Sequence, residues 1–236
     1  MEWYRAKHKI GMPRTGGKQM KDFSFWMEYD GAAEGSGRSE KLWLMNPDTG
    51  QIGLFKFKKD ISTTDHVSEC IACDLASLVG LSCAKFEIGV YKGREGSISY
   101  NIVDQKGIVL IEGIYCISSM YHGFDEELLL DVETGEKYSL DMIKTVLEPL
   151  CLFNDFLPIL VFDFLIGNTD RHQSNWALIL EKERLSISPL YDNSSSLCAY
   201  VKESKIKDYL GNDKLLWKSL VDTKSKSLIR ISSNDT

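Results

Sequence analysis

The chain has 236 residues, of which 43% are hydrophobic and 26% charged, as in a soluble globular protein with one large or two small domains. Its formal net charge of −6 argues against a surface built for nucleic acid or for an anionic membrane. No signal peptide or membrane-spanning run is visible, so we expect a cytoplasmic location, although secretion to another cell is also compatible with the sequence. The six cysteines are expected to be free thiols, buried or partly buried.

The first part of the chain is typical of a basic arm followed by strands. Residues 1–22 are polar and basic, and 23–29 alternate enough to predict a strand. Turn residues at 46–50 predict a hairpin that joins strands 42–45 and 52–58. The glycine-rich stretch 30–41 before this hairpin has two readings, a flexible loop or a loop whose N–H groups approach a ligand.

The second strand of that hairpin and the next helix carry opposite charges. Alternation puts Phe55 and Phe57 on one face of the strand, and Lys56 and Lys58 on the other. These lysines could simply be solvated on an edge strand. Residues 64–79 predict a helix with an apolar stripe (Val67, Ile71, Leu75, Leu78), and His66 is expected on an exposed sector. Glu69 lies opposite the stripe among small residues, so it is either solvated or paired with a lysine of the neighbouring strand.

The rest of the chain predicts a compact α+β lobe and then a helical one. Segments 83–91 and 97–103 predict a hairpin around a turn at 92–96, and 107–117 predicts a strand that ends near Glu112. The acidic, turn-rich stretch 118–138 is interpreted as the passage between lobes. Helical spacing follows at 143–150, and an apolar run at 156–166 predicts a central helix buried on all sides. One or two short helices and a frayed end at 232–236 are expected after residue 202.

A polar loop, Gly167-Asn168-Thr169-Asp170-Arg171-His172-Gln173-Ser174-Asn175, follows the apolar run and precedes a strand-like segment. Protein kinases use the same five-residue step from Asp170 to Asn175 in their catalytic loop. Asp192 follows another short apolar strand. Two carboxylates and one amide at neighbouring strand ends form the oxygen-rich site that magnesium prefers when phosphates complete its shell.

These segments together resemble the HipA-like kinase family, in order over about residues 28–200. The specific parts are Asp170-Arg171-His172-x-x-Asn175 and the segment from Tyr191 to Leu197. The resemblance implies an α+β, two-lobed protein-kinase-like fold. Its N-lobe, residues 23–117, is an antiparallel sheet with one helix, and its C-lobe, residues 118–236, is mostly helical. Phe-Gly is absent after Asp192, the stretch after it is short, and the family's N-terminal subdomain is missing. We therefore expect a minimal or shortened member.

The resemblance also implies roles for single residues. Asp170 is the expected catalytic aspartate, Asn175 and Asp192 are the expected metal ligands, and Lys56 is the expected phosphate lysine with Glu69 as its partner. Arg171 and His172 are interpreted as structural. The remaining expected ATP-binding residues are the phosphate loop and the hinge near 111–114: Ser36, Gly37, Arg38, Ser39, Glu112 and Ile114.

The implied function is an ATP- and magnesium-dependent (Mg2+) phosphotransferase. As the family resemblance implies, we expect a serine/threonine protein kinase that can phosphorylate its own Ser36 or Ser39, with an antitoxin-like protein as a candidate partner. No direct nucleic-acid or membrane partner is expected. Two alternatives stay open. Phosphoinositide kinases share the Asp-Arg-His-x-x-Asn core, which also allows a phosphoinositide or small-molecule kinase. The short C-lobe allows a pseudokinase that binds nucleotide without turnover.

Overall fold

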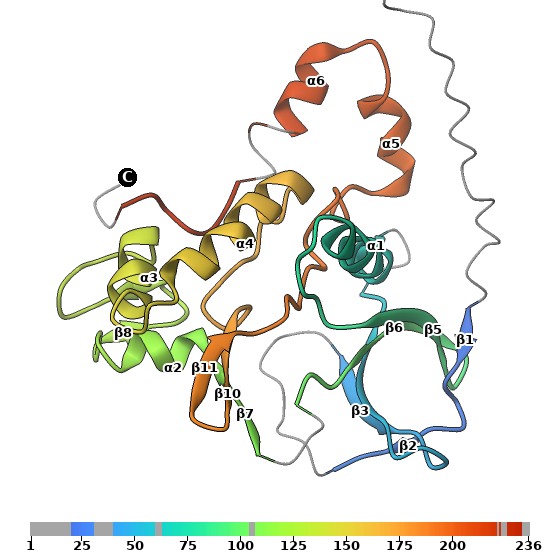
Figure 1. The fold of residues 1–236 in the computed structure, drawn as a ribbon. Coiled ribbons are helices and arrows are strands. Elements are labelled where there is room, and N and C mark those ends of the chain that lie inside the picture. The colour runs from blue at the N-terminus through green and yellow to red at the C-terminus, as the bar shows by residue number, and fades with distance from the viewer. Residues whose placement is uncertain are drawn as a thin grey trace, which may run out of the picture.

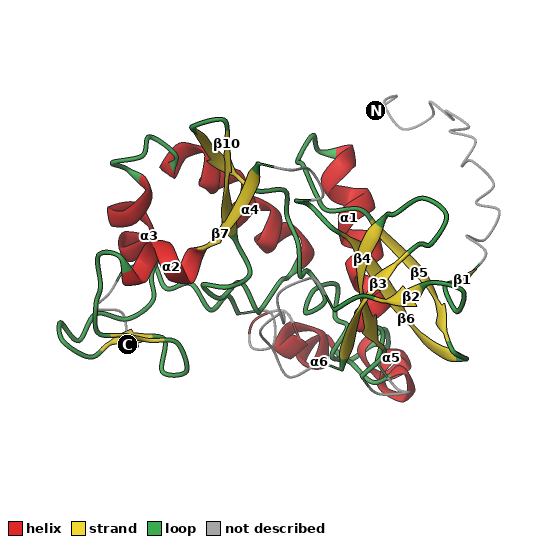
Figure 2. Ribbon diagram, turned by 90° about the horizontal axis from the view of Figure 1, so that it is seen from below, coloured by secondary structure: helices red, strands yellow, loops and turns green. Residues whose placement is uncertain are grey.

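The computed structural model of the chain describes residues 20–30, 40–59, 63–103, 107–220, 222 and 226–232. Two groups of elements lie side by side, a curled sheet with helix α1 and a mainly helical part (Figure 1, Figure 2). Helices α5 and α6 stand beside α1 and α4, at the top of Figure 1.

The curled sheet has six strands in the order β1-β5-β6-β4-β3-β2. All neighbours pair antiparallel except β1 and β5, which are parallel. One face carries an aromatic core that includes Phe23, Trp26, Phe55, Phe57 and Tyr91. The strands are β1 (Lys21–Asp22), β2 (Met27–Glu28), β3 (Lys41–Met45), β4 (Ile52–Phe57), β5 (Phe86–Tyr91) and β6 (Arg94–Tyr100).

Both predicted hairpins of this sheet are confirmed. The turn at 46–50 sets Met45 opposite Ile52, and this register brings Lys41 opposite Lys56. As the alternation predicts, Phe55 and Phe57 are buried and Lys56 lies on the other face. The second hairpin turns within two residues, Lys92 and Gly93, which both have positive φ, as the tightest hairpin turns require. The predicted turn at 92–96 is therefore too long.

Helix α1 (Asp65–Leu78) packs against β5 and β6 with its small-residue face. Its buried residues include Ser68, Glu69, Ala72 and Ala76. The expected apolar stripe does not form the buried face, since Leu78 is 81% exposed. His66, expected on an exposed sector, is buried. Small side chains let the helix approach closely, which removes the surrounding water from Glu69 and His66.

The second part contains a three-stranded sheet, a short two-stranded pair and the helices α2 to α4. The three strands are ordered β11-β10-β7 and are antiparallel. An apolar cluster centred on Met142, Phe156, Phe162 and Trp176 joins these elements. The elements that follow β6 in the chain are β7 (Ile108–Glu112), α2 (Gly113–Ser118), β8 (Phe124–Asp125), β9 (Leu130–Asp131), α3 (Leu140–Leu147), α4 (Phe153–Ile166), β10 (Ala177–Glu181), β11 (Arg184–Ile187), α5 (Glu203–Tyr209) and α6 (Lys214–Ser219).

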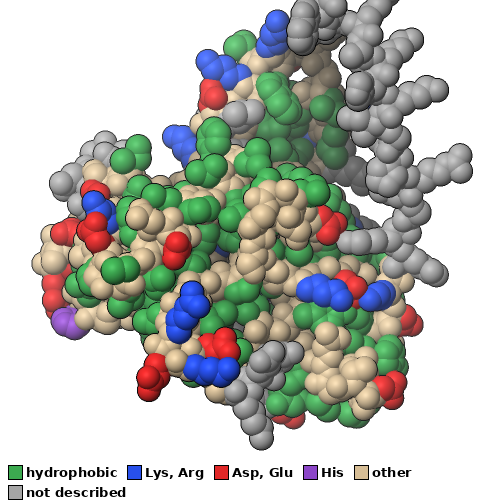
Figure 3. All heavy atoms as spheres, viewed as in Figure 1, with side chains coloured by type: hydrophobic (Ala, Val, Ile, Leu, Met, Phe, Trp, Pro, Cys, Tyr) green, Lys and Arg blue, Asp and Glu red, His purple; other side chains and the backbone are tan. Residues whose placement is uncertain are grey.

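Three local predictions are wrong in whole or in part. The expected strand 23–29 is interrupted, because 23–26 turn inward to bury Phe23 and Trp26. The strand expected within 107–117 does end at Glu112, as predicted, but the rest of that range forms the unpredicted helix α2. Helix α4 is not buried on all sides, since Phe164 is 89% exposed beside exposed Val161 and Leu165. Figure 3 shows exposed apolar side chains on this face of the molecule.

The cysteine prediction holds for all but one residue. All six thiols are free, and five are buried or half-buried, whereas Cys151 after α3 is exposed. Among the described helices, none combines the length and the apolar character that crossing a membrane requires.

Candidate active site

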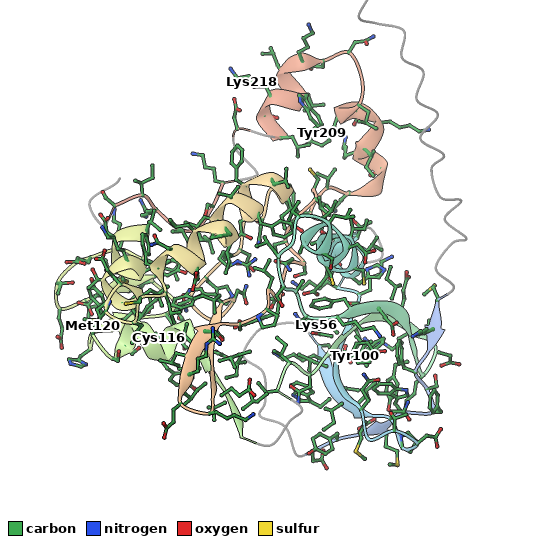
Figure 4. The ribbon with its side chains drawn as sticks, in the orientation of Figure 1. Lys56, Tyr100, Cys116, Met120, Tyr209 and Lys218 are labelled. Atoms are coloured by element: carbon green, nitrogen blue, oxygen red, sulfur yellow. The ribbon has the colours of Figure 1, made fainter. Side chains whose placement is uncertain are left out.

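Lys56 of β4 lies between two carboxylates from distant parts of the chain. Its Nζ is 3.0 Å from Asp192 Oδ1 and 3.8 Å from Glu69 Oε1. The backbone N–H of Asn193 donates to the same Glu69 oxygen at 3.2 Å. Lys56 thus lies between the six-stranded sheet and α1, as Figure 4 shows. The expected pairing of Lys56 with Glu69 is present, and the solvated alternative for Glu69 is excluded by its burial.

Burial and charge shift the pKa values of these three groups. Burial alone would lower the pKa of Lys56, but Glu69 and Asp192 outweigh it and raise the pKa above its usual range. Burial raises the pKa of the Glu69 carboxyl to about 7, although the positive charge of Lys56 acts to lower it. Burial would also raise the pKa of Asp192, yet Lys56 and the Ser194 hydroxyl lower it to about 2. Asp192 is therefore ionised at neutral pH.

The polar loop begins where α4 ends. Gly167 closes the helix in the left-handed conformation, φ 63°, which glycine adopts without a steric penalty. The side chain of Asn168 accepts from the backbone N–H of Asp170 at 3.1 Å. Asn175 Nδ2 donates to the Asp170 carbonyl oxygen at 2.7 Å, which fixes the amide and makes its Oδ1 the atom suited to a cation. The loop thus holds Asp170 and Asn175 as one unit.

Arg171 fastens this loop to the protein. Its guanidinium is fully buried and makes a two-pronged ion pair with Asp163 of α4, at 2.9 and 2.7 Å. It also donates to the carbonyl oxygens of Asn175 and Tyr191 and to the side chain of Asn193. The prediction that Arg171 pins the loop to neighbouring carbonyls is confirmed. His172 accepts from the Ser174 N–H through Nδ1 and is half-buried.

Residues of the polar loop and the Lys56 cluster line one cavity of about 850 Å³. Asp170, Asn175 and Asp192 meet Lys56 and Glu69 there. A smaller cavity of about 160 Å³ shares Lys56, Asn175 and Asp192 with it. Leu54, Phe86, Ile102, Val103, Leu110 and Tyr191 make much of that second lining apolar. A cavity that holds many charged side chains, beside a smaller and more apolar one, suits the two halves of a nucleotide.

The pKa of Asp170 depends on its position in the larger cavity. Burial raises the pKa of its carboxyl, and the nearby charge of Asp192 acts in the same direction. His172 and Lys59 oppose the shift. A carboxylate with a raised pKa is a better proton acceptor than an ordinary aspartate.

The other expected binding residues have different outcomes. Glu112 lines the smaller cavity, whereas Ile114 lies on α2 and lines neither. Lys58 pairs with Glu95 at 3.5 Å and lines neither cavity. The expected phosphate loop, Ser36, Gly37, Arg38 and Ser39, lies outside the described residues.

Lys41 is a cavity residue that is not among the residues singled out above as ATP-binding. It lines both cavities. The hairpin register gives the signal that could have found it, because Lys41 lies directly opposite Lys56. Ser174 and Tyr191 also line the smaller cavity, and only their closeness to Asn175 and Asp192 in the sequence could have suggested them.

The donor set fits a magnesium ion that is held together with phosphates. Asp192 and Asn175 are oxygen ligands, and Mg2+ commonly takes one or two carboxylates and lets substrate phosphates complete its shell. In the part of the chain that the structure describes, no cluster of three or more His, Cys, Asp or Glu could hold a metal ion alone. The residues therefore fit a shared site rather than a metal-binding cage.

Sequence comparison shows the family of the chain. The profile of the HipA-like C-terminal domain matches residues 33–229. The chain therefore belongs to this family, as the resemblance predicts. No curated protein sequence matches it significantly.

Solved structures agree with this result. The chain is similar to the proinflammatory kinase CtkA of Helicobacter pylori, with 20% identity and a TM-score of 0.73, over 90% of this chain and 75% of CtkA. It is also similar to HipA of Shewanella oneidensis, solved with HipB and operator DNA, with 17% identity and a TM-score of 0.50. That match covers 73% of this chain and 46% of HipA. The fold is kinase-like, and family and fold together support a kinase.

Proposed function

We propose that this HipA-like domain is an ATP- and magnesium-dependent phosphotransferase that acts on a serine or threonine of a protein. One observation carries the proposal: Lys56 lies 3.0 Å from Asp192 and 3.8 Å from Glu69, in a cavity that Asp170 and Asn175 also line. Phosphoryl transfer needs positioned charge more than covalent chemistry, and this group supplies it.

Each side chain has one task in this proposal. Lys56, held by Glu69, binds the α- and β-phosphates, and the smaller apolar cavity takes the adenine ring. Asp192 and Asn175 hold Mg2+, which when bound neutralises charge on the phosphates. Asp170 orients the acceptor hydroxyl and takes its proton, a task that its raised pKa favours.

The family resemblance supports two finer proposals. The first is that the protein phosphorylates itself on Ser36 or Ser39, because a phosphate-covering loop brings its own hydroxyls near the transferred group. A phosphoserine there adds nearly two negative charges where ATP must bind and so expels the nucleotide. The second is an antitoxin-like protein partner, as HipB is found with HipA.

The proposal is tested with radiolabelled ATP and three acceptors: a casein-like protein, phosphoinositide vesicles and sugars. We expect transfer to protein that needs Mg2+ and falls by about 100-fold or more in Asp170→Ala and Asp192→Asn. Asp208→Asn, an exposed carboxylate on α5, is the matched control and keeps full transfer. Phosphopeptide mapping of wild type beside Asp170→Ala tests residues 31–41. Magnesium-dependent transfer retained by Asp192→Asn would contradict the metal role.

A further inference from the structure

Residues 126–129 border the larger cavity on the side of the catalytic loop. Glu126, Glu127 and Leu128 line this cavity together with Asp170 and Gln173, and none of these five lines the smaller one. The proposed phosphate site, Lys56 with Asn175 and Asp192, is common to both cavities. If the nucleotide base occupies the smaller cavity, the acceptor reaches Asp170 through the larger cavity, part of whose lining this segment supplies. We call Glu126, Glu127 and Leu128 the acidic rim.

The acidic rim is held in place while its side chains stay exposed. The backbone N–H groups of Glu127 and Leu128 both donate to Asp125 Oδ1 at 2.9 Å. The next residue, Leu129, packs against the main apolar cluster, and its carbonyl accepts from Tyr138 N–H at 2.8 Å. Glu126 and Glu127 are exposed and form no ion pair with any described residue. Two carboxylates therefore face the acceptor side without a neutralising partner.

Gln173 adds a buried acceptor that has no donor. The side chain is only 4% exposed, lines the same cavity, and its Oε1 has no hydrogen-bond partner. Its Nε2 donates to the Glu126 carbonyl at 3.5 Å, which directs the amide oxygen elsewhere. A buried polar atom without a partner costs free energy, so a ligand that supplies an N–H donor gains from meeting it.

We propose that the acidic rim and Gln173 form the acceptor-specificity site, and that they select a peptide with an arginine close to the serine or threonine. This inference rests on the proposed phosphotransferase activity. All three polar groups accept hydrogen bonds, and a guanidinium offers five donors and no acceptor. Leu128, 65% exposed, suits the aliphatic stem of the same side chain. A phosphoinositide headgroup would bring negative charge against this rim and be repelled.

The lysines that line the larger cavity come from other elements than the carboxylates of the acidic rim. Lys41, Lys56 and Lys59 come from β3, β4 and the residues that follow β4, on the opposite lobe. Lys56 already faces Glu69 and Asp192. His172 and Lys59 both lower the pKa of Asp170.

Peptide binding tests the site without requiring turnover. Fluorescence anisotropy compares two serine peptides that differ only in arginine or its uncharged analogue citrulline, on the full chain. We expect the arginine peptide to bind about 3- to 10-fold more tightly, as for two exposed ion pairs, with a preference that weakens at high salt. Glu126→Gln/Glu127→Gln should abolish the preference. Glu181→Gln/Glu183→Gln removes the same charge from exposed positions around the β10–β11 turn and should keep it.

The outcomes separate the two proposals. Equal affinity for both peptides, a preference that survives in Glu126→Gln/Glu127→Gln, or tighter binding of phosphoinositide vesicles than of the arginine peptide would overturn the acceptor site. Phosphate transfer to the same peptides is measured in parallel. Selective arginine binding without transfer to any acceptor would refute the phosphotransferase and leave the rim as a cationic-peptide site. Equal phosphate transfer to the arginine and citrulline peptides would refute the acceptor site and leave the phosphotransferase proposal standing.

Discussion

Arg171 explains how the polar loop holds the side chains of the proposed active site in fixed positions. One buried guanidinium bonds to Asp163, to the carbonyl oxygens of Asn175 and Tyr191, and to Asn193. Asp170 directly precedes Arg171 in the chain. Asn175 supplies one of the contacted carbonyl oxygens, and Asp192 lies between the contacted residues Tyr191 and Asn193. A lysine could not replace this fork, since it lacks the planar set of donors. The proposed chemical residues are thus held by a neighbour that does no chemistry.

At the residue scale, Lys56 and Lys58 give the clearest comparison. We expect Lys56→Met to weaken ATP binding by about 10- to 100-fold, roughly 1.4–2.8 kcal/mol, because a charge-assisted contact to phosphate is lost. Lys58→Met should change it by less than about threefold, since Lys58 pairs with Glu95 and lies outside the cluster. Calorimetric titration with ATP and Mg2+ measures both.

Lys56→Met also leaves Glu69 buried without its cation, so thermal unfolding must show that the variant is folded. Lys56→Arg keeps the charge and is the conservative control. A larger loss of affinity in Lys58→Met than in Lys56→Met would show that the assignment of the phosphate lysine is wrong.

At the element scale, the junction between β7 and α2 packs closely against the end of the polar loop. Gly113, the first residue of α2, donates its N–H to the Trp176 carbonyl at 2.8 Å. A Cβ at Gly113 would lie 2.2 Å from the Trp176 ring and 2.6 Å from the Gln173 carbonyl oxygen. Only glycine allows this approach, at the point where β7 ends and α2 begins.

Gly113→Ala should therefore disturb both stability and activity. We expect a loss of about 1–3 kcal/mol in the free energy of unfolding, as for other overpacked sites, with a lower kcat because Gln173 and Trp176 must shift. Urea unfolding and steady-state kinetics measure the two effects. Gly135→Ala is the control: its positive φ strains alanine, but open space surrounds it, so kcat should not change. Unchanged stability in Gly113→Ala would refute the close-packing argument.

At the scale of the whole molecule, the sequence predicts what local patterns encode. Alternation placed Lys56 correctly, turn residues gave both hairpins, and the Asp170-to-Asn175 step together with Asp192 was visible because each motif is contiguous. The contact of Gln173 with Glu126 joins residues far apart in sequence, and no local pattern announces it. The exposure of Phe164 was equally hidden, because composition shows that a helix is apolar but not which of its faces has a partner.

Glu69 connects the two parts of the molecule. It lies on α1, its Oε1 is 3.8 Å from Lys56 of β4, and the same oxygen accepts from Asn193 beyond the β11 strand. Helix α1 also contributes Ala72 and Ala76 to the main apolar cluster of the second part. This carboxyl thus lies where the two parts meet, and its raised pKa makes stability depend on pH.

The direction of that dependence follows from proton binding. The folded Glu69 carboxyl has a pKa of about 7, and its ordinary value is 4.5. Between these values the folded state binds more protons than the unfolded state, so this carboxyl makes the protein less stable as pH rises through the window. The stability that Asp192 contributes, with its pKa of about 2, is lost only as pH falls below its ordinary value of 3.8, so the two effects do not overlap.

Glu69→Gln isolates the effect. We expect the free energy of unfolding of wild type, minus that of Glu69→Gln, to fall between pH 5 and 7 by at most about 1.4 kcal/mol per pH unit, and to level off above pH 7. Urea titrations at fixed ionic strength measure it. Glu148→Gln, the same substitution at an exposed position after α3, is the matched control. If wild type instead gained stability over Glu69→Gln as pH rose, the attraction of Lys56 would outweigh burial, and Glu69 would be an ionised partner of Lys56 throughout the physiological range.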